Sequence, residues 1–490
     1  MMKFTLMDPS IWEGRLFSHG WRRGTNAAVE VTDKATGEAI GSVADASPDE
    51  VRQACLLAAE AAAAWSRMPV EERARIVLRA GALLEQYAEE AIYWLVRESG
   101  STRFKAAFEV KLTAMHFENS AQAVTRVWKQ VLKDDEQSLS YIERVPLGVV
   151  GVIAPFNFPL ILGLRSVSAA LAAGNTVVLK PSLNTAVSGG ILIARLFEEA
   201  GLPAGVLHVL PGGGEAGAAL AEDPRLAMVA FTGSTRVGRK IGATAGAALK
   251  RVSLELGGKS PLLVLPDADV EMAARAGAFG SFLHQGQICM TIGLHLVPES
   301  LAGQYTSRVA ELGKAMKVGD PYTQQVALGP IISEKQRNNI DAVVKDAIRH
   351  GADLVEGGTF EGLFYRPTVL GNVGKGSRAF SEEIFGPVAV IVTYKDEEEA
   401  IRLANGTGYG LSCAVFGELD HARKVAARIE SGMVHINDQT VQEDARAPFG
   451  GTKASGNRAR IGGEADLEEY TTWRWVTETR LPIPYEIANS

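Results

Sequence analysis

Aliphatic runs and helical repeats alternate through the middle of the chain. Five short runs have the length and composition of buried strands, and the segments between them repeat apolar positions at helical spacing. The expected strands are Val149–Ala154, Thr176–Lys180, Gly205–Leu210, Ala227–Thr232 and Arg251–Leu256. The expected helices are Pro159–Ala173, Ala186–Ala200, Glu215–Ala221 and residues 234–249. This alternation predicts a doubly wound, Rossmann-like parallel sheet, with a ligand site beyond the carboxyl ends of its strands.

Other segments extend this predicted core on both sides. Ser47 and Glu50 form a Ser-x-x-Glu capping box, with proline at the first helical position, and so predict an early helix through residues 51–65. A second α/β region is expected over residues 257–466. The segment Val127–Val145 fits neither region and is interpreted as a projecting hairpin.

The composition is typical of a soluble globular protein with two or three domains. Of 490 residues, 46% are hydrophobic and 22% are charged. The net charge of −7 offers no electrostatic footprint for nucleic acid or an anionic membrane. The apolar segment Val145–Leu164 is long enough to span a bilayer, but its three prolines and Asn157 indicate strand, turn and helix. The first residues lack the apolar core of a secretory signal, and a cytoplasmic protein is expected.

The three cysteines differ in their surroundings. Their odd number argues against a disulfide framework and for a reducing compartment. Cys55 falls in the apolar stripe of the early helix and Cys413 in an aliphatic run, so both are interpreted as core residues. Cys289 instead follows Gly-Gln-Ile in a turn, where a structural thiol has little to pack against. It is the candidate nucleophile, and no metal site is expected.

Two charged residues end predicted strands. Glu255 lies on the face opposite the aliphatic side chains of its strand, and is either a solvated strand end or a general base. Lys180 ends the second strand, where NAD-binding sheets usually carry a carboxylate for the adenosine ribose. It is either an ordinary surface lysine or a contact for that ribose or its 2′-phosphate.

Two glycine-rich turns are candidates for binding a phosphate. Residues 212–217, GGGEAG, match the G-x-G-x-x-G pattern, but they follow the third strand and not the first. In FTGSTRVG, Gly233 and Gly238 bracket a helix start whose free N–H groups could receive a pyrophosphate. Either turn could equally be a tight strand-to-helix connection that needs glycine for backbone reasons.

Seven motifs occur in the order found in one family. They are APFNFP, VVLKPS, FTGSTRVG, LELGGKSP, GQIC, EEIFGP and PFGGTKASG. With them the sequence resembles the NAD(P)-dependent aldehyde dehydrogenases over nearly its whole length. LRSVSAALAAGN, FLHQGQICM and MVHINDQ are similar to the branch that oxidises benzaldehyde and related aromatic aldehydes.

The resemblance implies a division of the chain. The NAD(P)-binding domain would comprise residues 1–126 and 146–256, and the catalytic domain residues 257–466. Residues 127–145 and 467–490 would form a small β arm for self-association as a dimer or tetramer. The strand-like TTWRWV segment in this arm alternates Trp with Thr and Arg, as an edge strand does.

The resemblance also implies the roles of individual residues. Cys289 would be the nucleophile, Glu255 the general base, and the Asn157 amide an oxyanion donor together with the Cys289 backbone N–H. Cofactor contacts would come from Lys180, Ser182, Leu183, Gly213, Gly217, Phe231, Gly233, Ser234, Val237, Glu383 and Phe385. The substrate tunnel would be lined by Phe158, Leu162, Arg165, Ile288, Met290 and Phe449. This largely apolar set suits an aryl ring.

The expected chemistry accounts for these residue types. A thiolate adds to the aldehyde and makes its carbon tetrahedral, so that hydride can leave to a nicotinamide and a thioester remains. Water activated by Glu255 would then release the acid.

The chain departs from the family pattern in three places. Phe156 stands where tryptophan is common, and Leu294 where an arginine usually follows the nucleophile. Leu183 stands where many NAD-specific members carry glutamate. Because a carboxylate there would repel the 2′-phosphate of NADP, its loss predicts use of both NAD and NADP.

Several other functions compete with this interpretation. Within the family, the substrate could be an aliphatic aldehyde or a semialdehyde, or the enzyme could transfer the acyl group to coenzyme A. Glu255 favours hydrolysis over that transfer. A cysteine hydrolase would use Cys289 with His435 and Asn437, in the order Cys, His, Asn. A non-catalytic binding relative is disfavoured by the joint presence of Cys289, Glu255 and Asn157.

Overall fold

The structure is a computed structural model that describes residues 4–125 and 128–481. Residues 1–3, 126 and 127, and 482–490 lie outside the described residues, and with them parts of the predicted arm. In the part of the chain that is described, no helix is long and apolar enough to cross a membrane.

The first large sheet contains all five strands predicted from the aliphatic runs. Its order is β11 (Arg251–Glu255), β10 (Leu226–Thr232), β7 (Val149–Ile153), β8 (Thr176–Lys180), β9 (Leu207–Val209), β1 (Arg15–Ser18) and β2 (Trp21–Arg23). The five predicted strands are parallel, whereas β1 and β2 add an antiparallel edge. The chain moves outward from β7 through β8 to β9 and then crosses to β10. The switch point, where such sheets bind ligands, therefore lies between the carboxyl ends of β7 and β10.

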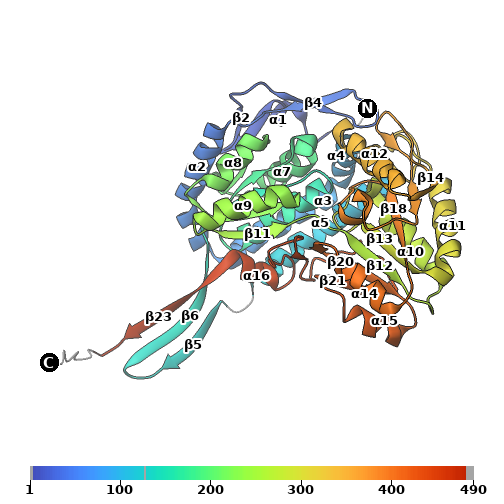
Figure 1. The fold of residues 1–490 in the computed structure, drawn as a ribbon. Helices are drawn as coiled ribbons and strands as arrows, with labels where there is room; N and C mark the ends of the chain where they lie inside the picture. Colours follow the sequence, from blue (N-terminus) through green and yellow to red (C-terminus); the bar gives the residue numbers. More distant parts are fainter. Residues whose placement is uncertain (1–3, 126–127, 482–490) are drawn as a thin grey trace.

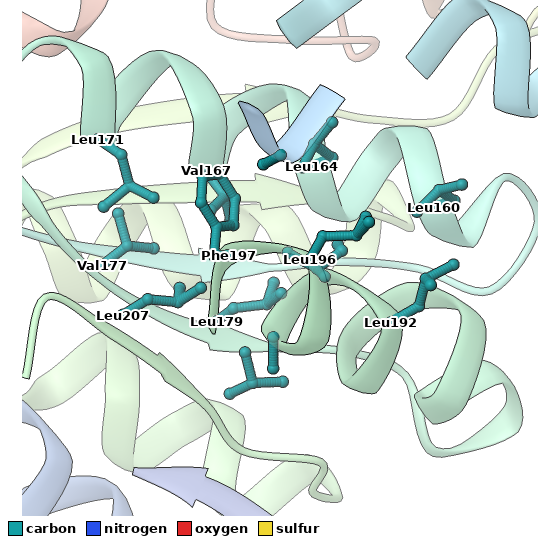
Figure 2. Packing of buried hydrophobic residues seen from close by; sticks show 14 of the residues in the cluster. Leu160, Leu164, Val167, Leu171, Val177, Leu179, Leu192, Leu196, Phe197 and Leu207 are labelled. Carbon is teal, nitrogen blue, oxygen red and sulfur yellow. The ribbon is translucent and has the colours of Figure 1, made fainter. Parts of the chain in front are cut away.

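Helices cover both faces of this sheet (Figure 1). One face packs against α2 (Pro48–Arg67), α8 (Gly214–Glu222) and α9 (Thr235–Ala247). The other packs against α6 (Pro159–Ala172) and α7 (Leu192–Glu199), and α3 (Val70–Gln86), α4 (Ala88–Ser99) and α5 (Arg103–Ala123) form a further layer over these helices. Figure 2 shows leucines of α6 and α7 meeting Val177 and Leu179 of β8 and Leu207 of β9. Because parallel strands buried on both faces need apolar side chains on both, each strand reads as a continuous aliphatic run.

The early helix begins as its sequence predicts. The Ser47 hydroxyl accepts a hydrogen bond from the Glu50 N–H, and the Glu50 carboxylate accepts one from the Ser47 N–H, so the capping box is confirmed. Cys55 and Cys413 are buried in cores on α2 and in the second sheet, also as predicted.

One predicted helix is partly wrong. The segment expected as a single helix from Ala186 to Ala200 follows a 3₁₀ turn η1 (Leu183–Thr185). It begins as a π-helical turn η2 (Val187–Ile191) and only then continues as α7. The buried Glu98 carboxylate accepts hydrogen bonds from the N–H groups of Val187 and Ser188, so a distant residue and not the local sequence caps this start.

The second large sheet carries the cysteine turn. Its order is β14 (Asp353–Glu356), β17 (Thr368–Gly371), β18 (Val388–Tyr394), β13 (Ile292–Pro298), β12 (Ser260–Val264), β20 (Ser412–Phe416) and β21 (Met433–Ile436). One face packs on α10 (Val270–Phe282) and α11 (Glu299–Ala315). The other packs on α12 (Glu334–Arg349), α13 (Arg378–Ser381), α14 (Glu397–Asn405) and α15 (Leu419–Ala426). The α/β fold expected from the sequence is confirmed.

A three-stranded sheet extends away from these layers (Figure 1). It consists of β23 (Thr471–Thr479), β6 (Ser138–Pro146) and β5 (Lys129–Asp134). The remaining elements are short: α1 (Pro9–Trp12), β3 (Val29–Thr32), β4 (Ala39–Val43), η3 (Leu283–Gly286), β15 (Phe360–Glu361), β16 (Phe364–Tyr365), β19 (Tyr409–Gly410), β22 (Thr452–Lys453) and α16 (Ala465–Tyr470). The boundaries of the predicted domains stay a prediction.

Candidate active site

One large cavity lies at the switch point of the first sheet. It has a volume of about 940 Å³ and is lined by residues that follow β7, β8, β10 and β11. Cys289 and Glu383, from the second α/β region, also line it. Both regions of the chain therefore contribute to one site.

The turn that carries Cys289 is held in an unusual conformation. His284, Gln285 and Gly286 are three successive residues with positive φ, of 49°, 57° and 66°. Such backbone costs free energy in a residue with a side chain, so the surroundings must impose it. The Gln285 amide donates hydrogen bonds to the carbonyls of Gly100 (3.0 Å) and Pro330 (2.9 Å). Side chains at the turn thus fix the place of the thiol before β13 begins.

The Cys289 thiol is protonated at neutral pH in this environment. Burial, reinforced by the carboxylate of Glu383, raises its pKa to about 12. A thiol with such a pKa becomes a nucleophile only when a base accepts its proton. The site therefore requires a neighbouring base.

Glu255 has the properties of such a base. Its side chain is only 2% exposed, and neither carboxylate oxygen has a hydrogen-bond partner. Burial raises its pKa to about 8, although Arg165 and Arg460 oppose the shift. The alternative interpretation, a solvated strand end, is wrong because the carboxylate points into the protein beside the cavity.

Asn157 lies in the turn between β7 and α6, and α5 holds this turn in place. The Lys105 ammonium donates to the Asn157 backbone carbonyl (2.8 Å) and pairs with Glu109 (2.5 Å), both side chains being fully buried. The other Glu109 oxygen accepts the N–H groups of Leu160 (2.9 Å) and Ile161 (3.2 Å). Glu109 thus caps the first turn of α6 from a different helix, and Asn157 cannot shift without breaking this network.

The sequence did not reveal these supporting residues. Lys105 and Glu109 are four residues apart on a helix, a spacing that usually marks an exposed ion pair. His284 packs edge-on against the Phe158 ring, with centroids 5.6 Å apart, while the Lys105 ammonium lies 4.0 Å from the centroid of that ring. Only the tertiary contacts show that α5 connects the nucleophile turn to the Asn157 turn.

All eleven predicted cofactor residues line the same cavity. Lys180 is buried, donates to the Gly212 carbonyl (2.9 Å), and has a pKa that burial lowers to about 8. Ser234 caps the N-terminus of α9 without a side-chain hydrogen bond, so that helix end opens on the cavity. A side chain at Gly233 would contact the Phe231 ring at 2.6 Å, so glycine is required at that position. Free helix N–H groups beside a buried ammonium fit the phosphates of a dinucleotide.

Glu383 and Phe385 form the opposite wall of the cavity. The Glu383 carboxylate accepts the Gly258 N–H (3.0 Å), and burial raises its pKa to about 7. The Phe385 ring stands edge-on to Phe156, one of the departures from the family pattern, with centroids 5.8 Å apart. A phenyl ring thus fills the position where tryptophan is common.

The predicted substrate residues form one apolar cluster next to Cys289. Its members from the prediction are Phe158, Leu162, Ile288, Met290 and Phe449. Arg165 is 1% exposed, lies with its guanidinium 4.6 Å from the centroid of the Phe449 ring, and donates to Glu443 at 3.3 Å. Arg165 therefore packs against the cluster and is paired with a carboxylate, but it does not line the cavity.

Three other residues singled out in the sequence lie away from the cavity. Leu294 is fully buried in the core of the second sheet and does not line the cavity. Asn437 exchanges two hydrogen bonds with Gly417, and neither it nor His435 lines the Cys289 cavity. The structure does not bring the residues of a cysteine hydrolase together. Among the described residues, no group of three or more His, Cys, Asp or Glu is placed to hold a metal ion.

The cavity combines the switch point of a doubly wound sheet, an open helix end and a cysteine. This arrangement is that of a nucleotide-dependent oxidoreductase. The chain belongs to the aldehyde dehydrogenase family, whose profile matches residues 21–476, and the resemblance of the seven motifs is confirmed. Members of this family use NAD⁺ or NADP⁺.

Similar proteins cover nearly the whole chain. A vanillin dehydrogenase of Amycolatopsis sp. is 49% identical over 475 residues, 96% of this chain and 98% of that protein. A benzaldehyde dehydrogenase [NAD(+)] of Pseudomonas putida is 43% identical over 486 residues, 99% and 100% of the two chains. A salicylaldehyde dehydrogenase from Pseudomonas putida G7, solved with salicylaldehyde, matches with a TM-score of 0.92 and 36% identity over 96% and 99% of the chains. An E. coli NADP dependent enzyme matches with a TM-score of 0.92 and 31% identity over 97% and 100%.

Proposed function

We propose that the protein oxidises aromatic aldehydes of the benzaldehyde type to carboxylic acids. The observation that carries this proposal is the meeting of Cys289 and the unpaired Glu255 carboxylate at one cavity, with an apolar cluster of aromatic and aliphatic side chains packed against Cys289. The vanillin, benzaldehyde and salicylaldehyde dehydrogenases among its relatives support the same substrate class.

In the first step, Glu255 accepts the Cys289 proton as the sulfur adds to the aldehyde carbon. Because the pKa of Glu255 is about 8, part of it is ionised near neutral pH and can act as a base. The carbonyl oxygen becomes an oxyanion, which the Asn157 side-chain amide and the Cys289 backbone N–H stabilise by about 3–4 kcal/mol per donor. The peptide of Asn157 is already fixed by Lys105, so little reorganisation is needed.

The bound nicotinamide of NAD(P)⁺ supplies the acceptor for the hydride that leaves the tetrahedral carbon. Lys180, the open end of α9 and Glu383 would hold the cofactor. The Cys289 thioester that remains is then hydrolysed. Glu255 takes a proton from water as the water oxygen attacks the acyl carbon, and the thiol regains a proton as the acid leaves.

The cluster around Cys289 favours a flat, apolar substrate. Phe158, Leu162 and Phe449 offer ring and aliphatic contacts, whereas a polyol or an amino-aldehyde would leave its polar groups unpaired there. Arg165, with its Nε and Nη2 atoms unpaired beside the cluster, would donate to an oxygen substituent of a ring bound there.

A substrate series tests this function. Initial rates would be measured with NAD⁺ and NADP⁺ for benzaldehyde, a hydroxylated benzaldehyde, short and long aliphatic aldehydes, betaine aldehyde and an acidic semialdehyde. The aryl aldehydes should give the highest kcat/KM. A clear preference for betaine aldehyde or the semialdehyde would contradict the proposal. Coenzyme A should give no acyl-CoA product, since Glu255 activates water instead.

We also infer that both cofactors are used. The residue three positions beyond Lys180 is the half-exposed Leu183, so no carboxylate at that position repels a 2′-phosphate. Lys180 and the Ser182 hydroxyl remain as partners for that phosphate.

We further infer that the chain self-associates through the three-stranded sheet of β23, β6 and β5. This sheet exposes Val131, Leu132, Trp473 and Trp475, with Trp475 69% exposed. Apolar side chains on an exposed sheet invite pairing with a second copy. Light scattering at micromolar concentration should give a dimer or tetramer, and a monomer would contradict this inference.

We also infer that the enzyme is cytoplasmic, because its three cysteines are free thiols, as is usual in a reducing compartment.

A further inference from the structure

Two guanidinium groups act on the charge of the Glu255 carboxylate. Neither of its oxygens receives a hydrogen bond, so its charge depends on the electrostatic field of its neighbours and not on direct contacts. Arg165 of α6 and Arg460 of the loop before α16 favour its ionised form, whereas Glu469 and Glu443 disfavour it. Cys289, whose own pKa Glu255 raises, also faces this carboxylate.

Arg165 is already engaged by other groups. Its Nη1 donates to Glu443 at 3.3 Å, and Glu443 also lies 3.4 Å from the His116 ring. The charge of Glu443 therefore offsets much of the field that Arg165 would exert on Glu255.

Arg460 is held differently. Its Nη1 donates to the backbone carbonyls of Gly451 (3.2 Å) and Ala459 (2.9 Å), which belong to the same loop. No carboxylate among the described residues lies within ion-pair distance of it. Neutral groups thus fix its position while its positive charge remains uncompensated.

A single glycine separates Arg460 from Glu255. A Cβ atom at Gly450 would lie 2.8 Å from Arg460 Nη1 and 2.9 Å from Glu255 Oε1. The guanidinium and the carboxylate therefore face each other across the space that a methyl group would fill. The φ of Gly450 is +156°, a backbone conformation that residues with side chains rarely adopt, so both its geometry and the space around it require glycine.

We propose that Arg460 is a positioning residue for the general base, which keeps the Glu255 carboxylate ionised and in place across Gly450. The proposal rests on the proposed role of Glu255 as the base. Both steps that need the Glu255 carboxylate, the deprotonation of Cys289 and the activation of water on the thioester, should respond to it. Removing the charge of Arg460 leaves the burial of Glu255 unopposed except by a partly neutralised Arg165, so its pKa should rise further.

The test compares Arg460→Gln and Arg460→Lys with Arg458→Gln, a matched change at an exposed arginine of the same loop. Turnover would be measured from pH 6 to 10, together with the burst of NADH in the first turnover. In Arg460→Gln the rise of kcat with pH should move up by about one pH unit, which lowers kcat at pH 7 about tenfold. A slower burst of unchanged amplitude and the plateau at high pH should remain. Arg460→Lys should restore most of the shift, and Arg458→Gln should match the wild type.

A purely structural role would lower turnover at all pH values without moving the pH profile, and that result would overturn the proposal. If Arg460→Gln folds poorly by circular dichroism, Arg460→Ala with added guanidinium ion provides a second test. Guanidinium should raise turnover at pH 7 and leave it unchanged at pH 10, where Glu255 is already ionised. Absence of rescue at pH 7 would count against the proposal.

Glu255→Gln measured in parallel distinguishes failure of the proposed function from failure of the role of Arg460. Full turnover in Glu255→Gln refutes the proposed function itself, whereas its collapse with an unmoved profile in Arg460→Gln refutes the role of Arg460 alone.

Discussion

The two ends of the cavity are built on different principles. At the cysteine end, successive left-handed residues, a buried ion pair and an unpaired carboxylate are held by side chains from distant elements. At the end near Lys180, glycine turns and a helix terminus offer backbone N–H groups, and Leu183 is half exposed. A reacting centre needs fixed geometry, because a small misplacement slows the chemistry greatly. A dinucleotide is bound by many separate contacts, so one change there should alter selectivity more than rate.

The largest effect should follow loss of the thiol. Cys289→Ala removes the sulfur that makes the aldehyde carbon tetrahedral, and NADH formation should fall to background in both the burst and the steady state. Cys55→Ala is the control, because that thiol is buried in the core on α2 and does not line the cavity. Steady-state and stopped-flow absorbance of NADH would measure both. Residual turnover within tenfold of the wild type in Cys289→Ala would falsify the assignment.

Loss of the base should separate the two halves of the reaction. Glu255→Gln keeps the shape of the side chain but cannot accept a proton, so a slowed single burst of NADH should precede a steady rate about 10²–10⁴-fold lower. In the wild type, the pKa of about 8 means that the carboxylate form grows as the pH rises. Turnover should therefore increase through pH 8, and in Glu255→Gln this increase should disappear. If turnover rose equally with pH in the wild type and in Glu255→Gln, another group would be the base.

The buried pair on α5 should have the next largest effect. Lys105→Met alone leaves Glu109 as an uncompensated buried charge, which costs about 3–5 kcal/mol of folding free energy. The double variant Lys105→Met with Glu109→Gln removes both charges and should regain most of that stability, while the Asn157 carbonyl still lacks its donor. We expect its kcat to fall about 10- to 100-fold with little change in KM. Thermal unfolding and steady-state kinetics would distinguish the two variants, and wild-type kcat in the double variant would exclude a positioning role for Lys105.

Some parts of the fold and of the site could be predicted from the sequence, and others could not. Cys289, Glu255 and Asn157 lie in local motifs, and the five strands follow from continuous aliphatic runs, so both could be predicted. Lys105 could not, because nothing in a Lys-x-x-x-Glu spacing distinguishes a fully buried pair from an exposed one. The π-helical turn before α7 was missed for the same reason, since its cap, Glu98, is distant in sequence. Features set by local residue spacing could therefore be predicted, whereas features set by contact with an element distant in sequence could not.

The smallest effect should come from the ribose end. In the wild type we expect NAD⁺ and NADP⁺ to support turnover with kcat/KM values within about two orders of magnitude, a gap of ~2.7 kcal/mol. Leu183→Glu places a carboxylate where the 2′-phosphate, with a charge of about −1.5 to −2, would lie. It should depress the NADP⁺ reaction far more than the NAD⁺ reaction, because only NADP⁺ brings the second negative charge. Leu183→Gln is the control, since it has the same size without the charge and should leave the ratio near that of the wild type. The result also sharpens the comparison of the two ends: kcat with NAD⁺ should stay close to the wild-type value, because Leu183 contacts no group that reacts. An unchanged NADP⁺/NAD⁺ ratio in Leu183→Glu, or a wild type inert with NADP⁺, would show that another part of the cavity selects the cofactor.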